Sequence, residues 1–176
     1  MSNESLSAPL EGIAALLIAH GVEFLVIGGQ AEYLFGSARP TQDVDICYKR
    51  DRQNYQKLAA CLQVMRAHLR GAPRDVPFLL DAKTLEMRSN FTLETDFGDL
   101  DILGFVEPIG DFNQLWERKE EYQVGDMLLR TIGLDDLLKV KLHINRVKDQ
   151  ESILQLKAIK RIRGEGGAGN TAARSV

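Results

Sequence analysis

Two pairs of aspartates in this 176-residue sequence have the spacing needed for joint chemistry. Asp43 and Asp45 alternate with apolar residues in Asp-Val-Asp-Ile, and Asp99 and Asp101 alternate in the same way in Asp-Leu-Asp-Ile-Leu. On an extended strand, residues i and i+2 project from one face, roughly 6–7 Å apart along the backbone. Carboxylates at this spacing repel each other. A bound Mg²⁺ ion relieves that repulsion, because it prefers one or two carboxylates together with phosphates and water.

A third carboxylate beside Asp43 and Asp45 would complete a site for two metal ions. Such a site lowers the pKa of an attacking hydroxyl and stabilises the charge on a transferred phosphoryl group. Asp101 stands between Leu100 and Ile102 in an expected strand, so we expect Asp101 to be this third ligand. The alternative interpretation is structural: two exposed acids on an edge strand, and an Asp99 that belongs to the turn at Gly98.

A pair of glycines, Gly28-Gly29, ends the apolar, β-rich run Phe24–Ile27. Glycine lets the backbone adopt positive φ and approach a ligand closely, so its N–H groups can point at a phosphate. Taken alone, the pair is also explained by an ordinary turn after a strand.

Together, these motifs resemble a known signature. Gly28-Gly29, a spacer of thirteen residues and Asp43-Val44-Asp45 are similar to the motif of the DNA polymerase β-type nucleotidyltransferase superfamily. The run from Arg39 to Asp45, Arg-x-Thr-x-Asp-x-Asp, resembles small bacterial nucleotidyltransferases, including those of toxin–antitoxin and abortive-infection systems. The resemblance covers about residues 22–162. It departs at Gln30, where a small hydroxyl residue is usual.

The resemblance implies transfer of a nucleotidyl group from a nucleoside triphosphate to an acceptor hydroxyl, with release of pyrophosphate. It also implies a two-metal site for Mg²⁺, or Mn²⁺ in its place, with Asp101 as the general base. The expected metal ligands are Asp43, Asp45 and Asp101, and the expected substrate-binding residues are Gly28, Gly29, Arg39, Thr41 and Lys141.

Other functions are compatible with parts of this pattern. The acceptor class stays open between RNA such as a tRNA-like molecule, a protein and a small molecule. The main alternative to an enzyme is a non-catalytic nucleotide-binding protein, antitoxin-like and acting with a partner protein. A glycosyltransferase with an Asp-x-Asp motif is disfavoured, because such enzymes usually have longer chains and the glycine pair has no role in them.

Hydrophobic periodicity predicts the elements that must position these residues. We expect an α/β fold: a mixed, twisted sheet flanked by helices, with a C-terminal helical pair as the second wall of the site. One domain is expected at 1–163, with closing helices at about 134–163 and a disordered tail at 164–176. The expected helices are 7–20, 30–35, 51–69, 81–88, a short one at about 112–116, 134–145 and 149–163, and the expected strands include 24–27, 44–48, 91–95 and 99–103.

Charge is distributed unevenly along the chain, although the net charge is only −3. The segment 137–163 holds eight basic and two acidic residues, whereas residues 1–136 carry −9. A basic segment suits a polyanionic partner such as a nucleoside triphosphate or RNA, and a solvated helix face is the structural alternative. An RNA acceptor would be expected to contact the basic residues near the end of this segment: Lys157, Lys160, Arg161 and Arg163.

Composition favours a cytoplasmic protein. Hydrophobic residues make up 44% and charged residues 27% of the chain, an ordinary globular balance. No apolar run approaches the roughly 18–20 residues of a membrane span, and no signal peptide is recognisable. Cys47 and Cys61 are too few for a disulfide framework and are expected to be reduced, partly buried thiols. His20, His68 and His143 are expected to be ordinary helix residues.

Overall fold

The computed structural model describes residues 6–39, 41–75, 78–165 and 174–175. Its helices are α1 (Ala8–Ala19), α2 (Gly28–Leu34), α3 (Arg52–Val64), α4 (Ala82–Met87), α5 (Phe112–Trp116), α6 (Leu134–Ile144) and α7 (Gln150–Glu165), with a 3-10 turn, η1, at Val147–Asp149. Its strands are β1 (Phe24–Ile27), β2 (Val44–Tyr48), β3 (His68–Leu69), β4 (Asn90–Thr95), β5 (Gly98–Leu103), β6 (Phe105–Val106), β7 (Gly110–Asp111), β8 (Glu120–Val124), β9 (Met127–Thr131) and β10 (Arg174–Ser175).

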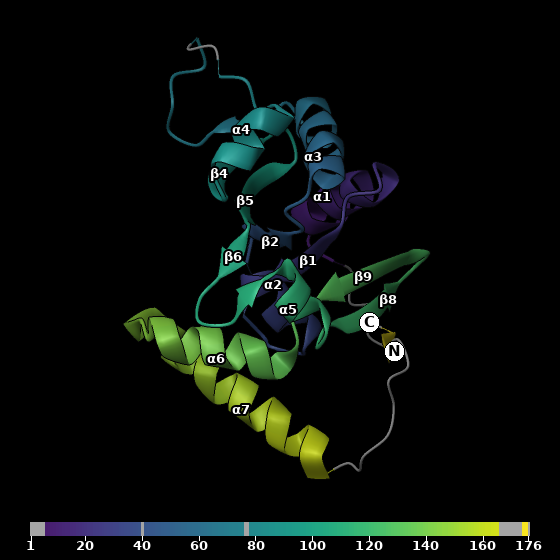
Figure 1. The fold of residues 1–176 in the computed structure, drawn as a ribbon. Helices are drawn as coiled ribbons and strands as arrows, with labels where there is room; N and C mark the ends of the chain where they lie inside the picture. The colour runs from purple at the N-terminus through teal and green to yellow at the C-terminus, as the bar shows by residue number, and fades with distance from the viewer. Residues whose placement is uncertain (1–5, 40, 76–77, 166–173, 176) are drawn as a thin grey trace.

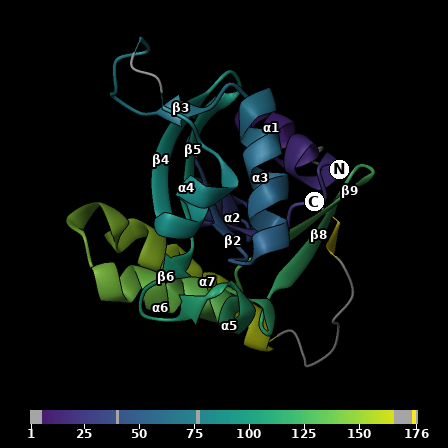
Figure 2. The ribbon, with the colours of Figure 1, turned by 45° about the horizontal axis from the view of Figure 1, so that its top comes forward.

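Eight of these strands form one mixed sheet in the order β10-β8-β9-β1-β2-β5-β4-β3. β1 is antiparallel to β2, whereas β2 is parallel to β5. Helices α1 and α3 pack together beside the sheet, and α6 and α7 form a pair at the other end of the molecule (Figures 1 and 2). The expected α/β fold, with its mixed sheet and its C-terminal helical pair, is confirmed.

The alternation of the acid motifs places one set of side chains in the core. Val44 and Ile46 of β2 are fully buried, and so are Leu100 and Ile102 of β5. The residues between them therefore face the opposite side of the sheet. All four residues of β1, which lies next to β2, are also buried. β1 and β2 therefore lie at the centre of the sheet.

Several expected boundaries need correction. The helix expected at 51–69 ends at Val64, because Arg66 takes a left-handed φ of 54° and breaks the helical path. His68, expected on a helix, lies in β3 and pairs with Glu94 of β4. Helix α2 begins at Gly28 rather than at Gln30.

The C-terminal boundary also differs from the expectation. Helix α7 continues to Glu165, two residues beyond the expected end of the domain. Most of the tail that was expected to be disordered, residues 166–173 and 176, lies outside the described residues. Arg174 and Ser175, in contrast, form β10 and pair in parallel with β8.

Other expectations concern single residues and the membrane. Cys47 and Cys61 are both free thiols, and both are fully buried rather than partly buried as expected. Across the described ranges, none of the helices has the length and apolar character needed to cross a membrane.

Candidate active site

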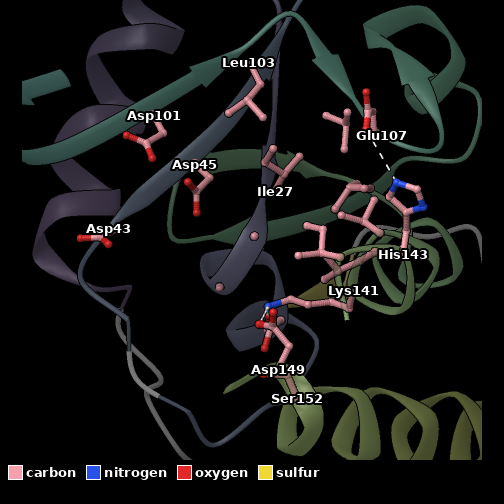
Figure 3. Close-up of a pocket in the computed structure, with 18 of the residues that line it drawn as sticks. Ile27, Asp43, Asp45, Asp101, Leu103, Glu107, Lys141, His143, Asp149 and Ser152 are labelled. Atoms are coloured by element: carbon pink, nitrogen blue, oxygen red, sulfur yellow. Dashed lines mark hydrogen bonds and ion pairs between the residues drawn. The ribbon is translucent and has the colours of Figure 1, made fainter. Parts of the chain in front are cut away.

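A cleft of about 930 Å³ lies between the sheet and the C-terminal helical pair. Its walls come from the end of β1, the start of α2, strands β2 and β5, the segment after β5, helix α6 and the first turn of α7 (Figure 3). Every residue expected in the site lines this cleft: Gly28, Gly29, Arg39, Thr41, Asp43, Asp45, Asp101 and Lys141.

The acids meet because β2 and β5 are parallel neighbours in the sheet. Asp45 is paired in register with Asp101, so the two side chains leave the same face of the sheet side by side. Asp43 lies one residue before β2 and is exposed at the mouth of the cleft. In Figure 3 the three carboxylates occupy one side of the cleft.

Burial and mutual repulsion act on these carboxyl groups. The pKa of Asp45 is raised from 3.8 to about 6, first by burial and then by the negative charges of Asp101 and Asp43. Burial also raises the pKa of Asp101, although the nearby Arg70 partly offsets this shift. Because the ionised form of these carboxyl groups is destabilised, a positive charge bound beside them would stabilise it.

Arg70, which follows β3, is a residue of this site that sequence reasoning missed. Its Nη2 atom donates to Asp101 Oδ1 at 2.9 Å and to the Leu93 carbonyl at 3.1 Å, and its Nε lies 3.3 Å from Asp99 Oδ2. The guanidinium reaches β5 from the edge of the sheet. Asp99 thus pairs with Arg70, and within the described part of the chain it is not among the residues that line the cleft.

The donor set of the three aspartates is chemically suited to Mg²⁺, which prefers carboxylate oxygens. Asp101 and Asp43 raise the pKa of Asp45 through their negative charges, and a bound divalent cation would relieve this repulsion. Nevertheless, the described residues contain no group of three or more His, Cys, Asp or Glu side chains arranged to hold a metal ion. Joint coordination by all three would therefore need an arrangement of these side chains that differs from the one in this structure.

The two glycines are required because the side chains of Asp45 and Thr41 pack closely against their backbone. Gly28 has φ +64°, and a Cβ on this residue would overlap the carboxylate of Asp45. A Cβ on Gly29 would come within 3.0 Å of the side chain of Thr41. Any larger residue would therefore displace Asp45 or Thr41.

Gln30 explains the departure from the usual signature. Its side chain is buried, donates to the Thr41 carbonyl at 3.1 Å and to the Asp43 carbonyl at 3.4 Å, and accepts from the hydroxyl of Ser7 at 3.1 Å. Gln30 therefore ties the loop that carries Asp43 to α2. It acts on the backbone of the site, in a position where a small hydroxyl residue was expected.

Lys141 is more constrained than the sequence indicated. Its ammonium group forms ion pairs with Glu32 of α2 and, at 3.1 Å, with Asp149 of η1, and the residue is 9% exposed. Arg146 Nε also donates to Asp149, at 2.6 Å. This network joins three elements at the wall of the cleft and leaves Lys141 paired with two acids.

Arg39 is the more accessible of the two predicted cations. It is exposed at the mouth of the cleft, and its Nη1 donates to the carbonyl of Lys148 at 2.7 Å. Arg146 and Lys148 are exposed residues that also line the cleft. Three cations therefore gather where the loop before β2 meets the turn before α7.

The remaining wall of the cleft has a different character. It is formed by the segment after Asp101 and by the last turns of α6, and it is mainly apolar. At its rim His143 Nε2 lies 3.7 Å from Glu107 Oε2 (Figure 3). Sequence reasoning assigned no role to Glu107, and His143 was set aside as an ordinary helix residue.

Comparison with known proteins gives the fold. No family model matches the chain, and no curated protein matches it. Solved structures do match. The lincosamide antibiotic adenylyltransferase LnuA, solved with lincomycin, has 21% identity and a TM-score of 0.56 over 86% of this chain and 96% of its own. ANT(2")-Ia, solved with adenylyl-2"-tobramycin, has 13% identity and a TM-score of 0.55 over 89% and 93%.

A Thermotoga maritima protein assigned to the nucleotidyltransferases also matches, with 16% identity and a TM-score of 0.53 over 85% of this chain and 90% of its own. At identities this low the likeness concerns the architecture. The chain therefore has the nucleotidyltransferase fold.

Proposed function

We propose that this protein is a metal-dependent nucleotidyltransferase that moves a nucleotidyl group from a nucleoside triphosphate to an acceptor hydroxyl. The observation that carries the proposal is the pairing of Asp45 with Asp101 in register across two parallel strands, in a cleft that also holds Gly28 and Gly29. The proposal is further supported by the fold, which the chain shares with two adenylyltransferases.

The cleft's own residues suggest how the reaction is arranged. Gly28 and Gly29 line the part of the cleft that would take the phosphates, and Arg39, Arg146 and Lys148 offset the phosphate charge at the mouth of the cleft. Asp101 accepts the proton of the acceptor hydroxyl. The hydroxyl oxygen then forms a bond to the α-phosphorus, and the bond from that phosphorus to the α,β-bridging oxygen breaks, so that pyrophosphate leaves.

Asp43, Asp45 and Asp101 are the proposed ligands of Mg²⁺, with Mn²⁺ as a substitute. When bound, the metal supplies a lowered pKa at the attacking hydroxyl and neutralises charge on the phosphates. Arg70 holds one oxygen of Asp101 and leaves the other oxygen for these tasks. Gln30 keeps the Asp43 loop against α2.

A direct assay tests the proposal. The protein is incubated with each α-labelled nucleoside triphosphate, Mg²⁺ and a deproteinised small-molecule extract, total RNA or a protein extract in parallel. We expect release of pyrophosphate and label in one acceptor fraction. Release with none of the triphosphates, in any fraction and with either Mg²⁺ or Mn²⁺, would contradict the proposed function.

A second candidate function is nucleotide binding without turnover, in an antitoxin-like protein that acts with a partner protein. The observations that favour it are the pairing of Asp101 with Arg70 and the pairing of Lys141 with Glu32 and Asp149, because both occupy groups that catalysis would use. Measurable binding of a triphosphate in the absence of any pyrophosphate release would support this candidate.

A further inference from the structure

A buried serine joins the loop before β2 to the last helix. Ser37 is only 4% exposed, although its neighbours Gly36 and Ala38 are exposed. Its hydroxyl donates to Gln155 Oε1 of α7 at 2.6 Å, across 118 positions of the chain. A buried hydroxyl with so distant a partner ties together two segments that the backbone alone does not connect. The proposed reaction, as described above, gives Ser37 no role.

The hydrogen bonds around Ser37 form a chain with one direction. The carboxylate of Glu151, one turn earlier on α7, can only accept, and it takes the Nε2 group of Gln155 at 3.3 Å. The amide oxygen of Gln155 is thereby turned toward the loop, where it accepts from the hydroxyl of Ser37. The oxygen of that hydroxyl in turn accepts from the backbone N–H of Arg39 at 3.4 Å. The chain therefore runs from α7 to the backbone of Arg39.

The side chain of Arg39 is held by the same part of the molecule. Its Nη1 donates to the carbonyl of Lys148 at 2.7 Å, in the turn that precedes α7. The backbone and the guanidinium of Arg39 are thus both bound to the C-terminal segment. Arg146 and Lys148 line the mouth of the cleft together with Arg39. These hydrogen bonds fix the loop cation relative to the two cations of the turn.

The loop has few other contacts that could hold Arg39 in place. Arg39 and Asp43 are both exposed. Gln30 binds the far end of the loop, through the carbonyls of Thr41 and Asp43. At the near end Ser37 is buried, and the residues on either side of it are exposed. Because segments with few buried contacts open most easily, the position of Arg39 depends on the hydrogen bond of Ser37.

We propose that Ser37 and Gln155 are positioning residues for the binding of a nucleoside triphosphate. Their hydrogen bond holds the loop of Arg39 against α7, so that the cations at the mouth of the cleft meet the phosphates as one preorganised set. Preorganisation strengthens binding, because the cations need not be ordered when the ligand arrives. This inference rests on the proposed function for the identity of the ligand. It concerns binding, and binding can be measured without turnover.

Calorimetry of the full chain with inorganic tripolyphosphate and Mg²⁺ tests the inference without assuming a preferred base. Ser37→Ala removes the donor of the hydrogen bond, and Gln155→Leu removes its acceptor. We expect each variant to bind tripolyphosphate about fivefold more weakly than the wild type, which corresponds to the loss of one hydrogen bond.

Gln150→Leu is the matched control for Gln155→Leu. Gln150 is an exposed glutamine of α7 whose amide donates to Asn145 Oδ1 at 2.9 Å. It is not among the described residues that line the cleft. We expect this variant to bind tripolyphosphate within about twofold of the wild type.

A double-mutant cycle distinguishes positioning from a purely structural role. If Ser37 acts through Arg39, Ser37→Ala should have no further effect on tripolyphosphate binding in an Arg39→Ala protein. In the transfer assay, Ser37→Ala should raise KM for the triphosphate about fivefold and change kcat by less than about twofold. A serine that only stabilised the fold would lower the free energy of unfolding and leave both readouts unchanged.

Circular dichroism and unfolding curves are recorded for every variant. If Ser37→Ala does not fold, Gln155→Leu carries the same test, because Gln155 is only partly buried. The cycle is then made with Gln155→Leu and Arg39→Ala.

The outcomes separate the two proposals. Weaker binding of tripolyphosphate by both variants, without pyrophosphate release from any triphosphate, would support the positioning role and count against the proposed transfer. Pyrophosphate release with an unchanged KM in both variants would support transfer and overturn the positioning role. Three further results would overturn it: no binding of tripolyphosphate by the wild type, wild-type affinity in both variants, or an equal effect of Ser37→Ala with and without Arg39.

Discussion

At the scale of single residues, the site is dominated by carboxylates that face each other on neighbouring strands. Burial first, and then the negative charges of Asp101 and Asp43, raise the pKa of Asp45 to about 6. Because the folded-state pKa lies above the unfolded value, ionised Asp45 costs the folded protein stability. This cost is absent below about pH 4, grows between about pH 4 and pH 6, and is fully present above pH 6.

Asp45→Asn removes the charge and should stabilise the fold at high pH. We expect the free energy of unfolding to rise by about 1–2 kcal/mol at pH 8, an amount reduced for partial exposure, and to change little at pH 4. Urea denaturation at both pH values measures this difference. A variant that is less stable than the wild type at pH 8 would contradict the electrostatic account of the site.

Asp101 and Asp99 provide a matched pair for testing the third ligand. Both contact Arg70, so Asn at either position removes one ion pair with the same guanidinium. Only Asp101 lines the cleft beside Asp45. We expect Asp101→Asn to lower the rate of pyrophosphate release by about 100-fold or more and Asp99→Asn to lower it by no more than about threefold.

The rates of both variants are measured at saturating triphosphate and Mg²⁺. Equal losses in the two variants would mean that both acids serve the reaction, or that Arg70, which they share, is the group that matters.

Among these residues, the sequence could predict the acids but not their partners. Alternation with buried Val44, Ile46, Leu100 and Ile102 was enough to aim the aspartates at one face. Arg70 could not be found in this way, because it lies 31 residues from Asp101 in the chain and reaches it across a neighbouring strand. Contacts of this kind depend on the tertiary structure and leave no periodic signal.

At the scale of elements, the C-terminal helices are joined to the sheet side of the cleft by buried charges. Lys141 of α6 is enclosed by Glu32 of α2 and Asp149 of η1, and the side chains of both acids are only 3% exposed. Removing one partner from such a buried network leaves the other charges uncompensated. The network should therefore fix the width of the cleft.

Lys141→Met tests this connection. We expect the substitution to lower the free energy of unfolding by about 3 kcal/mol, because the buried Glu32 loses its cation and Asp149 keeps only Arg146. Lys157→Met, at an exposed position of α7, is the control, and it should change stability by no more than about 0.5 kcal/mol. Denaturation midpoints of the two variants give both changes in stability. Equally small changes in the two variants would show that Lys141 does not stabilise the fold.

The longer elements were predictable from hydrophobic period, whereas the short strands and the order of the sheet were not. β3, β6, β7 and β10 have only two residues each, too few for a period. Their pairing depends on neighbours far away in the sequence. Helix α3 was predicted to extend to residue 69 instead of ending at Val64, because Arg66 is not a residue type that marks a left-handed turn.

At the scale of the whole molecule, the uneven charge has a structural explanation as well as a functional one. Part of the basic segment neutralises the acidic body of the same chain: Lys160 pairs with Asp135 and Arg163 with Glu120. The excess of positive charge on α7 is therefore partly used within the fold, which weakens the case for an RNA footprint there.

Salt dependence tests this interpretation. If α7 carried an RNA acceptor, changing Lys160 and Arg161 together to Ala would flatten the salt dependence of acceptor binding, at about 0.7 units of slope per lost contact. We expect instead that the double variant keeps the rate of transfer and its salt dependence. The measurement is transfer rate against ionic strength for both proteins, and a flatter slope in the double variant would restore RNA as the acceptor.

The central claim is that the carboxylate pair on β2 and β5 carries nucleotidyl transfer, and Asp45→Asn tests it most directly. Pyrophosphate release by this variant is measured with Mg²⁺ and the preferred triphosphate, beside an unfolding curve at the same pH. The account predicts a protein at least as stable as the wild type whose rate has fallen by about 100-fold or more. A folded Asp45→Asn protein that releases pyrophosphate at the wild-type rate would contradict it.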